Sequence, residues 1–184
     1  AVIDLSELDK IRDYPFEDTI APTEAIIYEC SVRDMTMHPF TGTTTHGKFK
    51  SLCEDGTEYR GLPTGLNYIK SLGVTHVQFM PLTDFSTVDD FKPELNYNWG
   101  YDPRQYLSLK GSFSSDPDHP YVRMKEFKEL VSCLHRNHLR VTLDVVFNHV
   151  YDVAESAFDC LVPYYYFRYN EEGYMSNGSY CGND

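Results

Sequence analysis

Three short apolar runs, separated by two helical patterns, constrain the fold of this chain most strongly. The runs cover residues 25–30, 74–80 and 140–147, and the helical patterns cover residues 64–72 and 121–138. We expect Thr64 to cap the first helix and Gly73 to end it. Strands that alternate with helices predict a parallel sheet with right-handed crossovers. The third run is rich in β-branched residues, which predicts a strand covered on both faces.

Loop lengths indicate which parallel fold this is. The segments that follow the first two strands are long, residues 34–61 and 82–119, whereas those that precede strands are short. This asymmetry is typical of a (β/α) barrel, whose active face lies at the carboxyl ends of its strands. A doubly wound sheet is the alternative, but its nucleotide-binding forms carry a glycine-rich turn that residues 30–34 lack. We therefore predict an α/β fold, the N-terminal portion of a TIM barrel, in residues 24–184. Residues 1–23 are expected to be a lead-in segment from an upstream region.

The carboxyl end of the third apolar run carries polar residues that could serve a site. These are Asp144, Asn148 and His149. Because Asp144 lies within the apolar run, its carboxylate needs a partner. The functional interpretation is that Asp144 orients a catalytic group or an arginine, while His149 donates to a substrate hydroxyl. The alternative is a turn whose side chains satisfy the local backbone.

An aromatic segment, residues 97–103 (YNWGYDP), holds the only tryptophan of the chain. Aromatic faces stack on the C–H faces of sugar rings, and carboxylates pair with hydroxyl groups. Trp99, Tyr101 and Asp102 on a loop above a barrel would therefore suit a sugar subsite. Residues 163–169 could form a second wall of that subsite, or an aromatic patch that packs a loop onto the barrel.

Charge and cysteine content exclude several classes of partner. The formal net charge is −12, which argues against nucleic acid or an anionic membrane, since both require a basic face. The five cysteines are odd in number and form no C-x-x-C pair, so we expect free thiols in a reducing compartment. No signal peptide or apolar run of about 18 residues is evident. These features favour the cytoplasm, with secretion after removal of a signal as the alternative.

Three groups of residues have the spacing of metal ligands, but each has a simpler interpretation. His135 and His138 lie three residues apart on a helix, without a third ligand nearby, and we expect them to be exposed at the helix end. The acidic pairs 89–90 and 116–118 are expected to be solvated loops rather than calcium sites. We predict no metal and no cofactor in this chain.

The same motifs carry a resemblance to a known family. Residues 144–149 resemble the first signature region of the α-amylase family of glycoside hydrolases, and residues 97–103 resemble the hallmark of its type I pullulanase branch. Supporting matches include residues 75–78, 84–90 and 176–184. Tyr164 stands where a glycine would be expected.

The resemblance implies a role for each candidate residue. Tyr101 would stack on the sugar at the cleavage subsite, with Asp102 and His149 hydrogen-bonding near it and Trp99 adding a wall. Asp144 would support the catalytic centre. Asn148, a calcium ligand in many amylases, is a weak metal candidate, because the pullulanase branch need not use that site; Ca²⁺ could still bind in the complete enzyme.

The catalytic carboxylates that the family uses are not found in this sequence. In the family the nucleophile and the proton donor follow the fourth and fifth strands, and a further aspartate follows the seventh. We predict that the chain is a fragment of an α-1,6-glucan debranching enzyme with a retaining mechanism, and that it is inactive alone. The alternatives are a non-catalytic glucan-binding module, or part of an isoamylase or branching enzyme. The expected partners are an α-glucan and either a second copy or the missing half-barrel.

Overall fold

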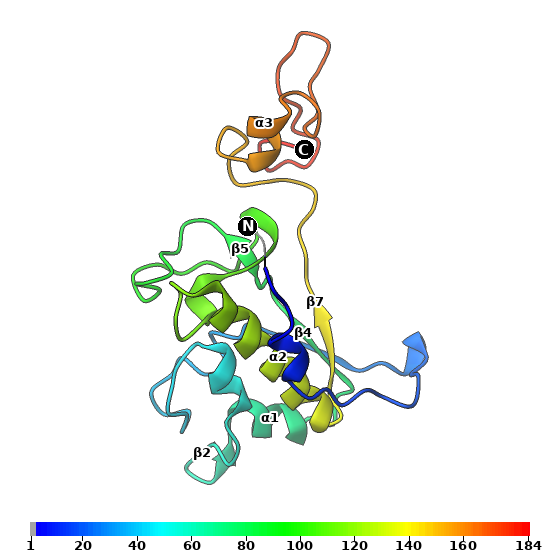
Figure 1. The fold of residues 1–184 in the computed structure, drawn as a ribbon. Helices are drawn as coiled ribbons and strands as arrows, with labels where there is room; N and C mark the ends of the chain where they lie inside the picture. Colours follow the sequence, from blue (N-terminus) through cyan, green and yellow to red (C-terminus); the bar gives the residue numbers. More distant parts are fainter. Residues whose placement is uncertain (1–2) are drawn as a thin grey trace.

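A computed structural model, which describes residues 3–184, is built on a three-stranded parallel sheet (Figure 1). Its strands are β1 (Ile27–Cys30), β4 (His76–Phe79) and β7 (Arg140–Leu143), in the order β1-β4-β7. The register aligns Tyr28 with Val77 and Val77 with Val141. The helices α1 (Gly65–Ser71) and α2 (Pro120–Arg136) supply the crossovers. The predicted parallel α/β arrangement is therefore confirmed.

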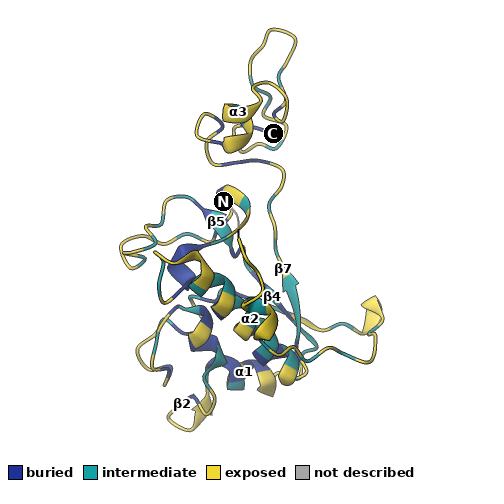
Figure 2. Cartoon of the chain, viewed as in Figure 1, coloured by how far each residue is buried: buried dark blue, intermediate teal, exposed yellow. Residues whose placement is uncertain are grey.

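The main core lies between this sheet and the helices (Figure 2). It combines alternate residues of the central strand with one face of each helix and with the short helix η3 (Phe49–Cys53). Its fully buried side chains include Phe49, Leu52, Leu66, Ile69, Val77, Phe79, Leu130 and Leu134. Because successive strand residues point to opposite faces, Glu29 and Gln78 lie on the other face, where they hydrogen-bond at 2.8 Å.

The third strand is shorter than predicted and is not covered on both faces. It ends at Leu143, and Asp144 is half-buried rather than enclosed. Val145 and Phe147 are exposed. The physical reason is that β7 pairs with β4 on one side only within residues 3–184, so its β-branched run has few neighbours to bury it.

The ends of helix α1 agree with the sequence only in part. Gly73 has φ +69°, a left-handed conformation that glycine adopts at low cost, and it follows the helix as predicted. Thr64 occupies the N-cap position as predicted, and its carbonyl accepts from the Tyr68 N–H at 3.2 Å, but its hydroxyl makes no bond to the helix backbone. The Thr64 hydroxyl donates instead to the Thr41 carbonyl, which ties the loop after β1 to the helix.

The two long segments predicted as loops contain secondary structure. Residues 34–61 include η3 and part of a two-stranded ribbon, β2 (Glu58–Tyr59) and β3 (Leu62–Pro63). Residues 82–119 include β5 (Thr83–Phe85), β6 (Pro103–Leu109) and η4 (Gly111–Phe113). β5 and β6 pair antiparallel with an irregular register. Most residues of β6 are exposed, so its sequence lacks the alternation that marks a half-buried strand.

The N-terminal segment runs along helix α2 and includes η1 (Leu8–Lys10) and η2 (Pro22–Glu24). His135 Nδ1 lies 2.9 Å from Asp13 Oδ1, and its ring packs edge-on against Phe16. Arg140 pairs with Asp18 at 2.9 Å. The prediction of an exposed His135 is therefore wrong, since this segment covers it, whereas His138 is exposed as expected.

The residues after β7 form a small lobe with its own apolar cluster. The lobe contains α3 (Ala157–Leu161), and Val150, Val153 and Phe167 are buried within it (Figure 1). Asn183 accepts a hydrogen bond from the Val150 N–H at 2.9 Å and donates to its carbonyl at 2.8 Å. Two side-chain bonds to one backbone residue hold the end of the lobe against its start.

Within residues 3–184, no helix combines the length and the apolar character needed to cross a membrane.

The open edges of the sheet generate a first prediction. β1 and β7 each pair on one side only among the described residues, and unpaired edges recruit other strands. We expect the isolated chain to self-associate, giving a native mass in light scattering that is a multiple of 21.3 kDa. Thr142→Lys places a charge on the β7 edge and should shift the mass toward the monomer. A monomeric wild-type chain would contradict this expectation.

Candidate functional site

The centre of the candidate site joins the loops after β5 and β7. The Tyr101 hydroxyl donates to Asp144 Oδ2 at 2.7 Å. His149 Nε2 lies 2.9 Å from the Tyr101 carbonyl oxygen, and because a carbonyl can only accept, this nitrogen carries the hydrogen. His149 is buried, and its own carbonyl accepts from the Tyr106 hydroxyl at 2.9 Å. Tyr101 is thus held at its side chain and at its backbone.

The protonation of Tyr101 follows from this setting. Burial, together with the hydrogen bond to Asp144, raises the pKa of Tyr101 to about 12. The phenol therefore stays protonated near neutral pH and acts as a donor. Asp144, predicted to need a partner, finds it in this phenol rather than in an arginine.

Asp102 faces away from that pair and belongs to a second polar group. The Asn98 amide donates to the Thr87 hydroxyl at 2.6 Å, and that hydroxyl donates to Asp102 Oδ2 at 3.3 Å. The other carboxylate oxygen, Oδ1, is buried with no protein partner. Burial raises the pKa of Asp102 above its ordinary value, against the lowering effect of its hydrogen bonds.

Gly100 sets the direction of the chain between these groups. Its φ is +100°, and a Cβ atom there would lie 3.0 Å from both the carbonyl oxygen and the side chain of Pro81. Any side chain at position 100 would therefore strain the backbone and collide with the end of the β4 segment. The buried Gly100 thus separates Trp99 from Tyr101 at a close approach of the two backbone segments.

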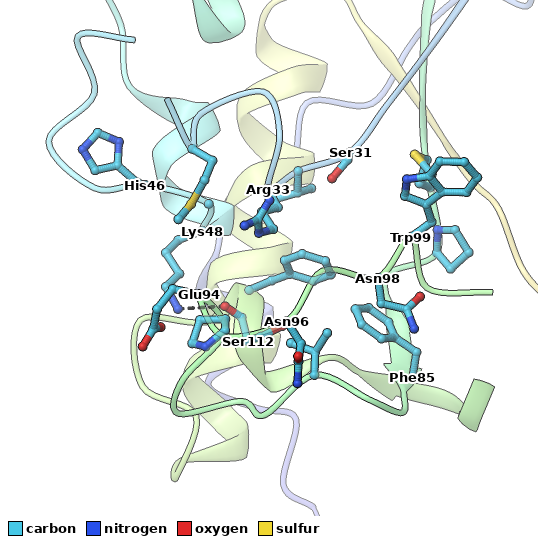
Figure 3. Close-up of a pocket in the computed structure, with 18 of the residues that line it drawn as sticks. Ser31, Arg33, His46, Lys48, Phe85, Glu94, Asn96, Asn98, Trp99 and Ser112 are labelled. Carbon is cyan, nitrogen blue, oxygen red and sulfur yellow. Dashed lines mark hydrogen bonds between the residues drawn. The ribbon is translucent and has the colours of Figure 1, made fainter. Parts of the chain in front are cut away.

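Trp99 lies apart from Tyr101, Asp144 and His149. It is 62% exposed. With Asn98 it lines a cavity of about 330 Å³ between the loops after β1 and β5, shown in Figure 3. Arg33, Lys48 and Phe85 also line the cavity, but Tyr101, Asp102, Asp144 and His149 do not. The structure therefore brings Tyr101, Asp144 and His149 together. Trp99 lines a separate cavity.

Two contacts that the sequence analysis missed fix the first residues of the aromatic segment. The Tyr97 hydroxyl donates to Asp34 Oδ2 at 2.6 Å, and the Arg33 guanidinium lies 5.1 Å from the centre of the Tyr97 ring. Burial and the bond to Asp34 raise the pKa of Tyr97. A signal for these contacts was present in the sequence. Arg33 and Asp34 form a charged pair in the loop after the first strand, at the predicted active edge of the sheet.

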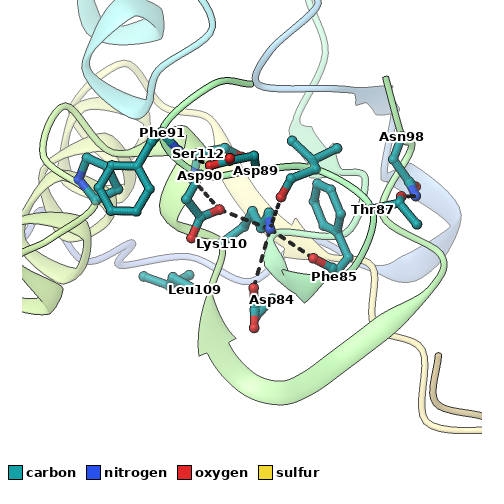
Figure 4. A network of polar contacts seen from close by, with 12 residues as sticks. Asp84, Phe85, Thr87, Asp89, Asp90, Phe91, Asn98, Leu109, Lys110 and Ser112 are labelled. Carbon is teal, nitrogen blue, oxygen red and sulfur yellow. Dashed lines mark hydrogen bonds and ion pairs between the residues drawn. The ribbon is translucent and has the colours of Figure 1, made fainter. Parts of the chain in front are cut away.

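The base of the aromatic segment is held by a buried ammonium group, which was also missed (Figure 4). Lys110 Nζ donates to the carbonyl oxygens of Phe85 and Val88, at 2.9 Å each, and lies 2.9 Å from Asp90 Oδ1. Asp84 lies 3.5 Å away. The interpretation of residues 89–90 as a solvated loop is therefore wrong for Asp90, whose carboxylate neutralises a buried cation.

The second aromatic segment, residues 163–169, combines packing and exposure. Phe167 is buried in the lobe cluster, whereas Tyr164, Tyr165 and Tyr166 are exposed. The Tyr166 ring lies 4.8 Å from that of Phe158. Tyr164, at the position where the family resemblance predicts a glycine, has φ +63°. Tyr164 therefore adopts a left-handed conformation that a glycine would adopt at lower cost.

Asn148, the weak metal candidate, lies at the surface beside His149. Asn148 is exposed, and its Oδ1 lies 3.3 Å from Nδ1 of the neighbouring His149. Nowhere in the described part of the chain do three or more histidine, cysteine, aspartate or glutamate side chains gather as potential metal ligands.

Residues 31–163, which begin directly after β1 and include β4, β7 and the candidate site, match the family described as "Alpha amylase, catalytic domain". The chain belongs to this family. The match covers most of the sequence and every candidate residue. It confirms the fold class, since the parallel strands and their crossovers form part of the barrel of this family.

Individual relatives confirm the resemblance to the pullulanase branch. The pullulanase of Bacillus subtilis (strain 168) is 44% identical over 171 residues, which are 92% of this chain and 24% of that protein. A chloroplastic pullulanase 1 of Arabidopsis thaliana is 29% identical over 85% of the chain. The chain spans about a quarter of the length of the first of these relatives.

Solved structures give the same result. The crystal structure of a pullulanase from Anoxybacillus sp. LM18-11, complexed with maltotetraose, is 47% identical and matches with a TM-score of 0.95. The match covers 100% of this chain and 27% of that one. A pullulanase from Paenibacillus barengoltzii, in complex with maltohexaose and α-cyclodextrin, matches with a TM-score of 0.91 at 44% identity.

The unpaired oxygen of Asp102 generates a second prediction. Because burial raises its pKa, the folded chain binds a proton on Asp102 more tightly than the unfolded chain does. The wild-type chain therefore gains stability as the pH falls toward the unfolded value near 3.8. At pH 7 we expect Asp102→Asn to raise the free energy of unfolding by less than about 1 kcal/mol, since partial exposure screens the charge.

Urea unfolding at pH 7 and at pH 4 checks this prediction, because the gain should shrink at the lower pH. Asp118→Asn, on an exposed loop, is the matched control and should change little at either pH. A loss of stability in the Asp102→Asn variant at pH 7 would contradict the argument.

Proposed function

We propose that this chain supplies part of the α-glucan-binding cleft of an enzyme that hydrolyses α-1,6-glucosidic bonds in pullulan, amylopectin or glycogen. The observation that carries the proposal is the cluster of Tyr101, Asp144 and His149 at the carboxyl ends of parallel strands, within the motifs of the pullulanase branch. Similar solved pullulanases are complexed with maltotetraose and maltohexaose, which supports an α-glucan as the ligand.

In this proposal Tyr101 forms the platform for one sugar ring. Its side chain is fixed by Asp144 and its backbone by His149, yet the residue remains 39% exposed. A rigid aromatic face loses little conformational freedom when it stacks on a pyranose ring. Asp102 accepts from a sugar hydroxyl through its half-buried carboxylate, and Trp99 contributes a neighbouring exposed ring.

The bond cleavage itself is assigned to other carboxylates. A retaining glycosidase needs a nucleophile and a proton donor about 5–5.5 Å apart on either side of the bond. Of the two carboxylates near the site, Asp144 accepts from Tyr101 and Asp102 is turned toward Thr87. We therefore assign Asp144 a supporting role at the catalytic centre, where it positions Tyr101. We assign Asp102 a role in substrate binding.

The platform role predicts the effect of removing the rings. Tyr101→Ala should weaken binding of maltotetraose about tenfold, because loss of a stacked ring costs about 1.4 kcal/mol. Trp99→Ala should have an effect in the same direction. Titration calorimetry with the isolated chain measures both, and Tyr180→Ala, which removes a 92% exposed ring of the lobe, is the control. Equal affinity in all four proteins would refute the platform.

A graft tests the hydrolytic part of the proposal. The isolated chain should release no reducing ends from pullulan. Residues 31–163, placed in the pullulanase of Bacillus subtilis in exchange for the matching segment, should preserve pullulan hydrolysis and leave amylose uncut. Tyr101→Ala in the graft should lower kcat/KM on pullulan. Binding without hydrolysis in the graft would favour the alternative of a glucan-binding module.

A further inference from the structure

Two of the five cysteines face one another between η3 and helix α2, remote from the candidate glucan site in the sequence. Cys53 is the last residue of η3, and Cys133 lies near the end of α2. η3 packs against α2, and both cysteine side chains face the space between these elements. Both also line one cavity of about 360 Å³. Both are free in this structure.

The surroundings of the two thiols differ. Arg136 Nη2 lies 3.8 Å from Cys133 Sγ, and Asn137 Nδ2 lies 4.0 Å from it, so two N–H donors point at this sulfur. Cys53 Sγ lies 3.8 Å from the Phe49 carbonyl oxygen, an acceptor that favours the protonated thiol. The negative charge of a thiolate is therefore best placed on Cys133, while the Cys53 S–H donates to the Phe49 carbonyl.

Electrostatics support the same assignment. Interaction with the Cys53 thiol, with help from the Arg136 guanidinium, lowers the pKa of Cys133 to about 7, against the opposing effects of burial and Asp55. Interaction with Cys133 and burial raise the pKa of Cys53, and Glu129 adds to that effect. Cys30 provides a contrast within the same chain, since burial without a donor raises its pKa to about 12.

We propose that Cys133 is a reactive thiol, that Cys53 is its resolving partner, and that the pair forms a disulfide by exchange with small anionic disulfides such as glutathione disulfide. The proposal stands on the paired thiols, the donors on Cys133 and the cavity beside them. It is independent of the proposed glucan function.

The exchange balances without any further reactant. The Cys133 thiolate attacks one sulfur of glutathione disulfide, which forms a mixed disulfide and releases one glutathione thiolate. Cys53 then loses its proton and attacks the Cys133 sulfur, which forms the Cys53–Cys133 bond and releases the second glutathione. The two protein thiols are oxidised, and one glutathione disulfide is reduced to two glutathione molecules.

The cavity fits an anionic reagent. Arg12, Lys50 and Arg136 line it beside the two sulfurs, with Glu129 as the carboxylate among the lining residues. Glutathione carries carboxylates that three cations would attract, whereas cystamine, a cationic disulfide, would be repelled. Glutathione disulfide should therefore react faster than cystamine at low ionic strength, and added salt should reduce the difference.

The decisive experiment maps the modified cysteines in the whole chain by mass spectrometry after brief exposure to glutathione disulfide at pH 7. The two exposed cysteines are first replaced, Cys160→Ser and Cys181→Ser, to remove competing thiols. We expect a Cys53–Cys133 cross-linked peptide and a free Cys30. Cys133 is 5% and Cys30 7% exposed, so exposure alone would predict equal, slow reaction at both.

Two variants separate the roles of the pair. Cys53→Ser should stop at a stable glutathione adduct on Cys133, because no resolving thiol remains. Arg136→Met should slow the first step at pH 7 by about two- to fivefold, because a rise of about one unit from a pKa of about 7 lowers the thiolate fraction about fivefold, while the more basic thiolate is a better nucleophile. The map of the chain that carries only Cys160→Ser and Cys181→Ser can overturn the proposal by itself: it fails if Cys30 reacts as fast as Cys133, or if Cys53 carries the adduct and no cross-link forms.

Discussion

The buried ammonium group of Lys110 is the interaction on which the candidate site depends. Its side chain is 5% exposed, so the charge is stable only because two backbone carbonyls and the carboxylate of Asp90 surround it. These acceptors belong to the segment after β5, whereas Lys110 itself follows β6. One cation therefore closes the base of the loop that carries the aromatic motif. If it were removed, those carbonyls and Asp90 would lose their partner together.

Tyr101 itself is positioned by Asp144 and His149, two side chains from the segment that follows β7. Asp144 follows β7 directly, and the Asp144 N–H donates to the Phe79 carbonyl at the end of β4, so the carboxylate is placed by the parallel sheet itself. His149 holds the Tyr101 carbonyl five residues further on. Because the phenol and the backbone of Tyr101 are anchored separately, the ring is fixed before any ligand arrives. Preorganisation of this kind lowers the entropic cost of binding.

The sequence predicted those features that depend on local pattern. The apolar runs located all three parallel strands, and the motif of residues 97–103 located Tyr101 and Asp102. Features that depend on distant partners could not be predicted in this way. β6 is a strand because it pairs with β5, although most of its residues are exposed. Asp90 looked like a solvated loop residue because its partner, Lys110, lies twenty residues away, and the length of β7 depended on which neighbours cover it.

Some aromatic residues of this chain connect the lobe after β7 to the main body rather than facing the candidate glucan site. His149 lies where the lobe meets the main body: the Tyr106 hydroxyl from β6 donates to its carbonyl, and the Tyr151 N–H donates to the Pro103 carbonyl at 2.8 Å. The Tyr106 ring packs against the lobe cluster that contains Phe167. The position of His149, and through it that of Tyr101, therefore depends on how the lobe packs. Residues 163–169 contribute to the site through this packing, because Phe167 belongs to the cluster against which Tyr106 packs.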